Sequence, residues 1–294
     1  MDDQALISQP ILPGRFVILR IFAIAVFALW YVSAEAVVVQ PVSLGAAQNF
    51  TLISSAGVTN AGNSVVHGNV ALSLLPTITG FSGTAGPRLV QGEIHYNDSL
   101  ARQARTDALN AFNTLAGLSY LPANNKTGLD LGNLTLTAGV YHFDSSVGLT
   151  GKLILDTQGD PNAIFVFQIG STLTTAVGSS VSIIGAGTGS DPNVFWQVGS
   201  SATLNSQTAF EGNLLAAAAV TLGTGATVEN GRVIALGASV MMLGNDLSAP
   251  LLTVTPEPST LVGLILLGVV VFGKVLVGKT KEVFQKTAYS ICQK

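Results

Sequence analysis

The stretch that decides the fold is residues 201–235, which read SATLNSQTAFEGNLLAAAAVTLGTGATVENGRVIA. The run Ser201–Leu204 returns as Ala219–Leu222, eighteen residues later. The run Phe210–Ala216 returns as Val228–Ala235, with one residue added. A repeat of this length fits one coil of a three-faced β-helix, in which each coil has three short strands and three corners.

Short strand patterns of the same kind extend away from this stretch in the N-terminal direction. Apolar and β-branched residues alternate with polar ones in runs bounded by glycine, at residues 133–137, 152–156, 163–169, 181–184 and 194–198. Alternation with a period of two predicts strands. Because each coil buries its inward side chains against the next, such a stack forms one long core. An ordinary β-sandwich is the alternative, but it does not account for the repeat.

One segment has a helical pattern instead. Residues 98–117 read DSLARQARTDALNAFNTLAG, and their apolar side chains recur at helical spacing on one face, at Leu100, Ala104, Ala108, Ala111, Phe112 and Leu115. Asn97 or Asp98 can cap the start, and Gly117 can end the helix. We expect its apolar face to lie on a side of the solenoid. A membrane-surface helix is the alternative, but this segment lacks the lysines and bulky aromatics typical of one.

The composition excludes several classes of protein. Charged residues make up 10% of the 294 residues and hydrophobic residues 48%, which is too apolar for a disordered chain. Residues 44–250 hold six basic and eleven acidic residues without a basic cluster, which argues against nucleic-acid binding. Cys292 is the single cysteine, and His67, His95 and His142 are far apart, so we expect neither a disulfide nor a metal site.

The first 36 residues have the pattern of a secretory signal peptide. Arg15 and Arg20 precede an apolar run from Ile21 to Val32, which the small residues Ser33 and Ala34 follow. A basic flank, an apolar run and a small-residue cleavage site are typical of such signals, and we place the cleavage after residue 36. An uncleaved membrane anchor is the alternative, but the run is short for one. Residues 37–254 then form the solenoid domain.

Residues 255–294 have the pattern of a linker, a hydrophobic helix and a basic tail. Pro256-Glu257-Pro258 precedes an apolar run from Leu261 to Val277, which is interrupted by Lys274. With the Lys274 ammonium at the interface, this run is long enough to span a bilayer. The end resembles the PEP-CTERM sorting signal of Gram-negative bacteria, although the tail contains lysines and no arginine. The resemblance implies export, followed by processing and release or by association with extracellular polysaccharide, so we expect a protein that is secreted or held at the cell surface.

Several long strings in the middle of the chain carry a second resemblance. They are LTLTAGVY at 134–141, LTGKLILDTQGDPNAIFVFQIGSTLTT at 149–175, VFWQVGSSATL at 194–204, FEGNLLA at 210–216, GRVIA at 231–235 and SVVHGNV at 64–70. With the inserted helix, they resemble the microbial ice-binding family over roughly residues 42–250. The resemblance implies a discontinuous right-handed β-helix with one long helix packed alongside. It also implies an activity on ice: antifreeze action, inhibition of recrystallisation or adhesion.

Binding ice requires a flat, rigid face of weak contacts in register, and threonine suits it. Its methyl is apolar, its hydroxyl can join ordered water, and β-branching restricts χ1. Thr203 and Thr221 are one repeat apart, and another eighteen residues lead to Ser239. We therefore expect an ice-binding face that includes the residues Thr172, Thr174, Thr203, Thr221, Thr224, Thr227 and Ser239. Ordinary outward threonines of a β-protein are the competing interpretation.

Two other functions compete with ice binding. A non-catalytic adhesin or matrix protein can use the same solenoid to hold polysaccharide. A polysaccharide lyase or hydrolase is the third hypothesis, and it requires clustered acidic and basic groups or paired carboxylates. Asp156 and Asp160 are close in sequence but do not form such a constellation with a basic catalytic residue, and no nucleophile-elbow motif is present. We therefore expect no enzyme activity and no cofactor.

Overall fold

The computed structural model describes residues 42–74, 77–81, 89–185 and 193–250. The chain divides into two compact units, residues 1–249 and 250–294, and the first unit holds every element described below. The expected signal peptide and the expected C-terminal hydrophobic helix lie outside the described residues. Within the described ranges, no helix combines the length and the apolar character that crossing a membrane requires.

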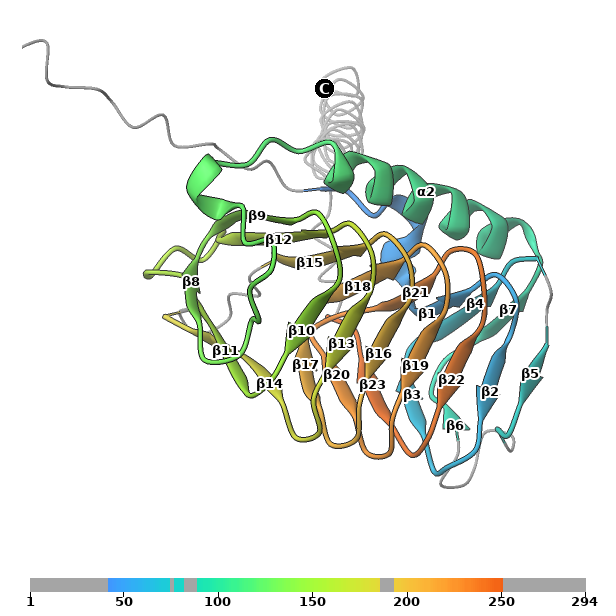
Figure 1. The fold of residues 1–294 in the computed structure, drawn as a ribbon. Helices are drawn as coiled ribbons and strands as arrows, with labels where there is room; N and C mark the ends of the chain where they lie inside the picture. The colour runs from blue at the N-terminus through green and yellow to red at the C-terminus, as the bar shows by residue number, and fades with distance from the viewer. Residues whose placement is uncertain (1–41, 75–76, 82–88, 186–192, 251–294) are drawn as a thin grey trace, which may run out of the picture. The chain divides into compact units, whose positions relative to one another are not determined.

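Three parallel sheets form the three sides of a coiled chain (Figure 1). Sheet A runs in stacking order through β9 (Gly139–Phe143), β12 (Ile164–Ile169), β15 (Asn193–Val198), β18 (Asn213–Ala216), β21 (Val233–Ala235), β1 (Phe50–Ser54), β4 (Asn69–Leu72) and β7 (Ile94–Tyr96). Sheet B runs through β10 (Val147–Leu149), β13 (Leu173–Thr175), β16 (Ala202–Leu204), β19 (Val220–Leu222), β22 (Val240–Met242), β2 (Val58–Asn60) and β5 (Ile78–Thr79). Sheet C runs through β8 (Thr135–Thr137), β11 (Lys152–Asp156), β14 (Ser180–Ile184), β17 (Ala209–Glu211), β20 (Thr227–Glu229), β23 (Asp246–Ser248), β3 (Val65–His67) and β6 (Leu89–Val90). Each coil therefore passes through sheets C, A and B in turn, as the expected three-faced β-helix requires.

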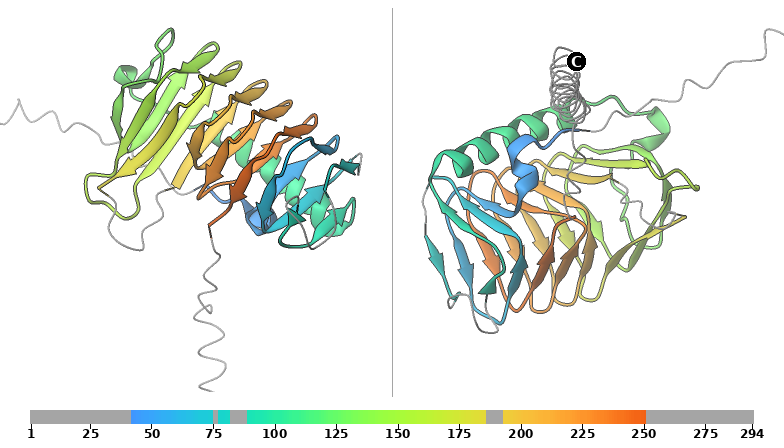
Figure 2. Two further views of the ribbon diagram at one scale, coloured as in Figure 1. Left: turned by 90° about the horizontal axis from the view of Figure 1, so that it is seen from below. Right: turned by 180° about the vertical axis from the view of Figure 1, so that it is seen from behind.

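The stacking order is discontinuous in sequence. The coil that ends the repeat region, with β21 and β22, pairs with β1 and β2 near the start of the chain. On the third side, β23 pairs with β3 in the same way. The N-terminal strands thus continue the stack where the C-terminal coils end, so that blue strands follow orange ones in Figure 2.

The long helix α2 (Ser99–Ala116) connects the two ends of this stack. It follows β7 at one end and packs along sheet A towards β12 and β15. Asp98 caps it by accepting a hydrogen bond from the Ala101 amide, and Gly117 ends it, as expected from the sequence. Ala101, Ala104, Ala108, Ala111 and Leu115 form its buried face.

The buried face of the helix differs from the expected one at two positions. Leu100 is 54% exposed, so its assignment to the apolar face is wrong, and Ala101 takes its place. Phe112 is only half-buried. Small alanine side chains let the helix approach the sheet closely, and a leucine at position 100 points away from that contact. Two short 3-10 helices, η1 (Gly45–Asn49) and η2 (Pro122–Asn124), complete the described helical elements.

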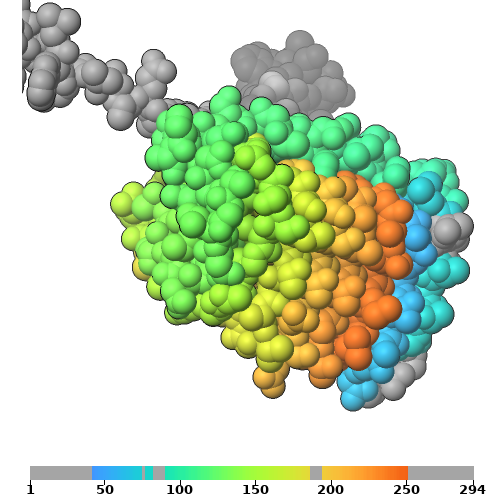
Figure 3. All heavy atoms as spheres, in the orientation of Figure 1, coloured from blue at the N-terminus to red at the C-terminus, as the bar shows by residue number. Residues whose placement is uncertain are grey.

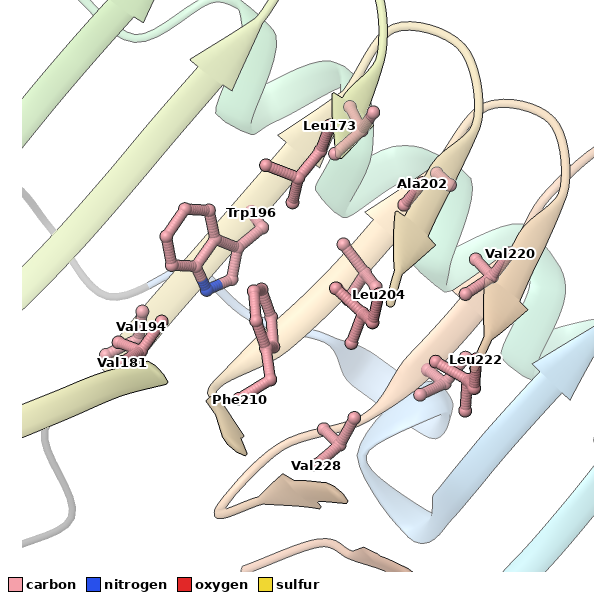
Figure 4. Packing of buried hydrophobic residues seen from close by; sticks show 14 of the residues in the cluster. Leu173, Val181, Val194, Trp196, Ala202, Leu204, Phe210, Val220, Leu222 and Val228 are labelled. Atoms are coloured by element: carbon pink, nitrogen blue, oxygen red, sulfur yellow. The ribbon is translucent and has the colours of Figure 1, made fainter. Parts of the chain in front are cut away.

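Inward side chains of successive coils stack into columns that fill the interior (Figure 4). Aromatic rings dominate the core beside the six-residue strands β12 and β15. Trp196 of β15 stacks on Phe167 of β12, with ring centroids 3.9 Å apart, and contacts Phe210 of β17 at 4.8 Å. The Trp196 Nε1–H donates to the Glu211 carbonyl oxygen at 2.9 Å, which satisfies its one polar group.

The corner between sheets C and A explains part of the sequence repeat. Gly231 and Gly212 occupy this corner in neighbouring coils, and a Cβ on Gly231 would lie 1.8 Å from the Gly212 carbonyl oxygen. Only glycine permits this approach, so the Glu-Gly-Asn and Glu-Asn-Gly strings at 211–213 and 229–231 mark the same turn.

A buried polar cluster joins the N-terminal segment to the C-terminal coils. The Ser64 hydroxyl donates to Asn60 Oδ1 at 2.8 Å, and the Asn245 amide N–H donates to Ser64 Oγ at 2.9 Å. The Asn245 side chain then donates to the carbonyl oxygens of Gly223 and Ala226 in the preceding coil. At the corner between sheets C and A, the buried Arg232 guanidinium donates to the Gln48 carbonyl oxygen. These bonds fix the register across the break in sequence.

We expect the substitution Trp196→Ala to lower the free energy of unfolding by about 3–5 kcal/mol, because it removes a fully buried ring from between two others. Urea denaturation followed by circular dichroism measures this loss. Val177→Ala is the matched control, since Val177 is 68% exposed and its truncation should change stability by no more than about 0.5 kcal/mol. A loss below about 1 kcal/mol for Trp196→Ala would contradict the stacked core.

Candidate functional site

The three sides of the solenoid differ in the chemistry of their outward side chains. The outward residues of sheet A are mostly apolar and are covered by α2 and η1, in a cluster that includes Ile53, Val166, Phe195, Leu215 and Ile234. This side is therefore closed to a large ligand.

Sheet C is open but carries most of the charged residues found on the strands. Its outward positions include Lys152, Asp156, Glu211, Glu229, Asp246 and His67. Glu211 and Glu229 are register partners on neighbouring strands. Charged groups bind water strongly and in their own geometry, so this side lacks a uniform, weakly hydrated surface.

Sheet B is open and carries a row of threonines. One outward residue of each strand, the central one in every strand except the two-residue β5, pairs in register with the next from one end of the sheet to the other. These residues are Gly148, Thr174, Thr203, Thr221, Met241, Thr59 and Thr79. We call this set the threonine row. Its residues are partly or fully exposed, whereas their strand neighbours are mostly buried in the core. Adjacent strands lie about 4.8 Å apart, so the threonines that are neighbours in the row repeat at about that spacing.

A second row of small residues runs beside the threonine row, two positions earlier in the chain and just before each strand of sheet B. It consists of Ser146, Thr172, Ser201, Ala219, Ser239, Gly57 and Thr77. The residue after each member donates its backbone N–H to the carbonyl oxygen of the next member along the stack. These hydrogen bonds keep the row aligned. The Thr172 hydroxyl also donates to Ser146 Oγ at 2.9 Å. No residue in either row is charged, and we call the two rows together the sheet B face.

The structure brings five of the seven expected site residues together on this face. Thr174, Thr203 and Thr221 lie consecutively in the threonine row. Thr172 and Ser239 lie in the second row, just before β13 and β22.

The expectation that Ser239 follows Thr221 in one column is wrong, because Thr221 pairs with Met241. The repeat lengthens within this coil. Phe210 pairs with Val228, eighteen residues on, but Leu214 pairs with Val233 and Val220 with Val240. One residue is thus added at each of two successive corners, which moves Ser239 into the second row.

Thr224 and Thr227 do not join the other five. Thr224 lies in the exposed corner between β19 and β20, outside both strands. Thr227 begins β20 on sheet C, where its register partners are Ala209 and Asp246. A change of direction at the corner therefore separates these residues from Thr221, although they are close in sequence.

Sequence reasoning missed Thr59 and Thr79, which extend the threonine row beyond Met241. Both belong to the N-terminal segment, far from the repeat in sequence. The string Gly57-Val58-Thr59 does resemble Ala219-Val220-Thr221. That similarity is a signal in the sequence that the two segments are equivalent. It indicates a shared face only because the N-terminal strands stack on the C-terminal coils.

The three histidines are separate, each beside an acidic side chain. His67 contacts Asp246 at 3.0 Å, His95 contacts Asp98 at 2.7 Å and His142 contacts Asp144 at 2.9 Å. The hydrogen bond from His142 lowers the pKa of Asp144, and the Ala101 amide followed by His95 lowers that of Asp98. Burial lowers the pKa of Arg232 to about 10. Among the described residues, no three His, Cys, Asp or Glu side chains gather where they could hold a metal ion.

The sheet B face is thus an uncharged, regularly spaced surface on a rigid support. Figure 3 views the solenoid from the side of sheet B, and the coils follow one another there without a deep hollow. Such a surface suits contact with an extended, ordered ligand better than enclosure of a small molecule, since small-molecule sites are concave.

The fold and this face define a class. It is a parallel, discontinuous β-solenoid with a helix along one side and threonine hydroxyls on another. The ice-binding-like family model matches residues 52–248. An ice-binding protein of Nostoc sp. (strain HG1) is 45% identical over 246 residues, which covers 82% of this chain and 87% of that protein. The chain therefore belongs to the ice-binding-like family.

Solved structures agree with this assignment. An ice-binding protein from an Antarctic biological consortium has a TM-score of 0.67 and 38% identity, covering 74% of this chain and 95% of that one. The ice-binding protein of the Antarctic ascomycete Antarctomyces psychrotrophicus has a TM-score of 0.66 and 37% identity, covering 72% of this chain and all of the other.

The register of the threonine row can be tested by cross-linking. In a Cys292→Ser background, the pair Thr59→Cys and Met241→Cys should form a disulfide on mild oxidation, because neighbouring strands bring their Cα atoms within bonding range. The pair Thr59→Cys and Thr221→Cys is the matched control. It is one strand further apart, beyond the reach of a disulfide. Mass spectrometry of proteolytic fragments distinguishes them, and cross-linking of the control pair alone would contradict the register.

Proposed function

We propose that this protein binds ice through the sheet B face. The observation that carries the proposal is the threonine row, in which five threonines on different strands share one register position. Each hydroxyl can join ordered water and each methyl offers a small apolar contact. Because each contact is weak, adsorption requires many of them at once, and a regular row supplies them.

The support behind this face favours the same function. A free side chain that must be ordered on binding loses entropy, which weakens the contact. Here the backbone is held by hydrogen bonds to both neighbouring coils, and β-branching limits the χ1 angle of each threonine. The face is therefore ordered before it meets a surface.

The names of the relatives point in the same direction. The matched proteins of Nostoc and of the Antarctic organisms are named as ice-binding proteins. Antifreeze action, inhibition of recrystallisation and adhesion to ice all follow from one adsorbing face, and we propose inhibition of recrystallisation as the activity to measure. We propose no catalytic role and no cofactor for the chain.

We further propose that the protein acts outside the cell, attached at least for a time to the cell surface. The N-terminal signal-like segment and the PEP-CTERM-like segment with its hydrophobic run support export and membrane attachment. The solenoid begins with η1 and ends with β23, at the corner between sheets C and A, where Arg232 contacts Gln48 and Gly231 contacts Ser248. This corner is opposite sheet B in a three-sided coil, so neither end of the described solenoid lies on the sheet B face. Extracellular polysaccharide is a second candidate partner for the attached protein.

We expect Thr221→Tyr to raise the concentration needed to inhibit ice recrystallisation at least about tenfold, because a bulky ring in the middle of the row holds the neighbouring contacts away from the ice. A splat-cooling assay with the protein at graded concentrations measures the effect. Circular dichroism confirms that the variant is folded.

Thr227→Tyr is the matched control, since it makes the same change on the next strand along the chain, which belongs to sheet C. It should leave the inhibition unchanged. Equal loss in both variants would reject sheet B as the face. A folded wild-type protein without any inhibition would reject ice binding itself and favour the adhesin or matrix function.

A further inference from the structure

One residue interrupts the threonine row. Met241 is the central residue of β22, and its register partners are Thr221 of β19 on one side and Thr59 of β2 on the other. After Gly148 at one end, the row therefore consists of a run of three threonines, a methionine and a run of two threonines.

Methionine differs from threonine in each property that the row repeats. It has no hydroxyl, so the series of hydrogen-bonding groups stops there. It is unbranched at Cβ and has three rotatable bonds, so its end is longer and less ordered than a threonine side chain. Met241 is 48% exposed, and its side chain extends into solvent rather than into the core.

The interruption lies at the break in the sequence order of the stack. β22 is the last strand that the C-terminal coils contribute to sheet B, and β2 is the first from the N-terminal segment. Met241 therefore separates the two parts of the face that come from distant parts of the chain. A surface that must contact an ordered lattice over its whole length is divided at this point.

The position of Met241 allows the effect of a substitution on surface binding to be separated from an effect on folding. Its strand neighbours Val240 and Met242 point inward and are fully buried, so they hold β22 in place. The residues on both sides of Met241 in the row are threonines whose strands tolerate that side chain. A threonine at 241 thus fits the backbone and leaves the core untouched.

We propose that Met241 limits the strength of surface binding by dividing the threonine row, and that a threonine at this position joins the two runs into one of six. This inference rests on the proposed ice-binding function of the sheet B face. It names the residue that sets the activity of that face rather than a second site.

The test compares Met241→Thr, Met241→Val and wild type as the full chain, prepared identically, in the recrystallisation assay. Met241→Thr should lower the inhibiting concentration about fivefold, which corresponds to about 1 kcal/mol for one added contact. Met241→Val has the shape of threonine without its hydroxyl, so it should lie between the two. Ser182→Thr is the matched control, because it adds a threonine at an outward position of sheet C and should change nothing.

Thermal unfolding of each variant accompanies the assay, so that a change in stability is not mistaken for a change in binding. Equal or weaker inhibition by folded Met241→Thr than by wild type would overturn the inference, although wild-type inhibition would still support ice binding. Improvement by Ser182→Thr as large as that of Met241→Thr would also overturn it. A lack of inhibition by wild type and all variants would instead reject the proposed function together with this inference.

Discussion

The parallel backbone hydrogen bonds between successive coils are the constraint on which the rest of the structure depends. In a parallel ladder every strand residue has a fixed partner on the next strand, so register passes from coil to coil. Phe167 and Trp196 are such partners, and so are Thr203 and Thr221. The same ladder therefore builds an aromatic column inside the solenoid and a hydroxyl row outside it.

This constraint extends across the break in sequence order. The N-terminal strands β1, β2 and β3 join the ladder on all three sides, so their side chains enter the existing columns. Arg232, Ser64 and Asn245 reinforce the junction with hydrogen bonds from side chains. Helix α2 makes this discontinuous order possible, because it carries the chain along sheet A from one end of the stack towards the other. The threonine row is consequently a composite of two distant segments.

The three sides have different roles because their outward residues differ, while their inward residues are alike. Apolar outward residues of sheet A, such as Val166 and Phe195, require the cover that α2 provides. Charged residues keep sheet C in contact with water. The sheet B face has neither an apolar cluster under a helix nor charged residues. Its threonines present their hydroxyls and methyls in one regular row. A single coil geometry therefore yields a packed side, a solvated side and a candidate binding side.

The sequence by itself determined the type of element and the class of fold. Period-two runs such as 152–156, the eighteen-residue repeat and the capped helix from Asp98 to Gly117 are local patterns, and local patterns express backbone preference and burial directly. Only the tertiary structure decided which residues share a face. Two residues added at corners moved Ser239 out of the column and put Met241 there, and a corner separated Thr227 from Thr221. Thr59 joined the row by pairing with Met241, more than a hundred residues away, and Thr79 follows through its own pairing with Thr59. No local pattern encodes the first of these pairings.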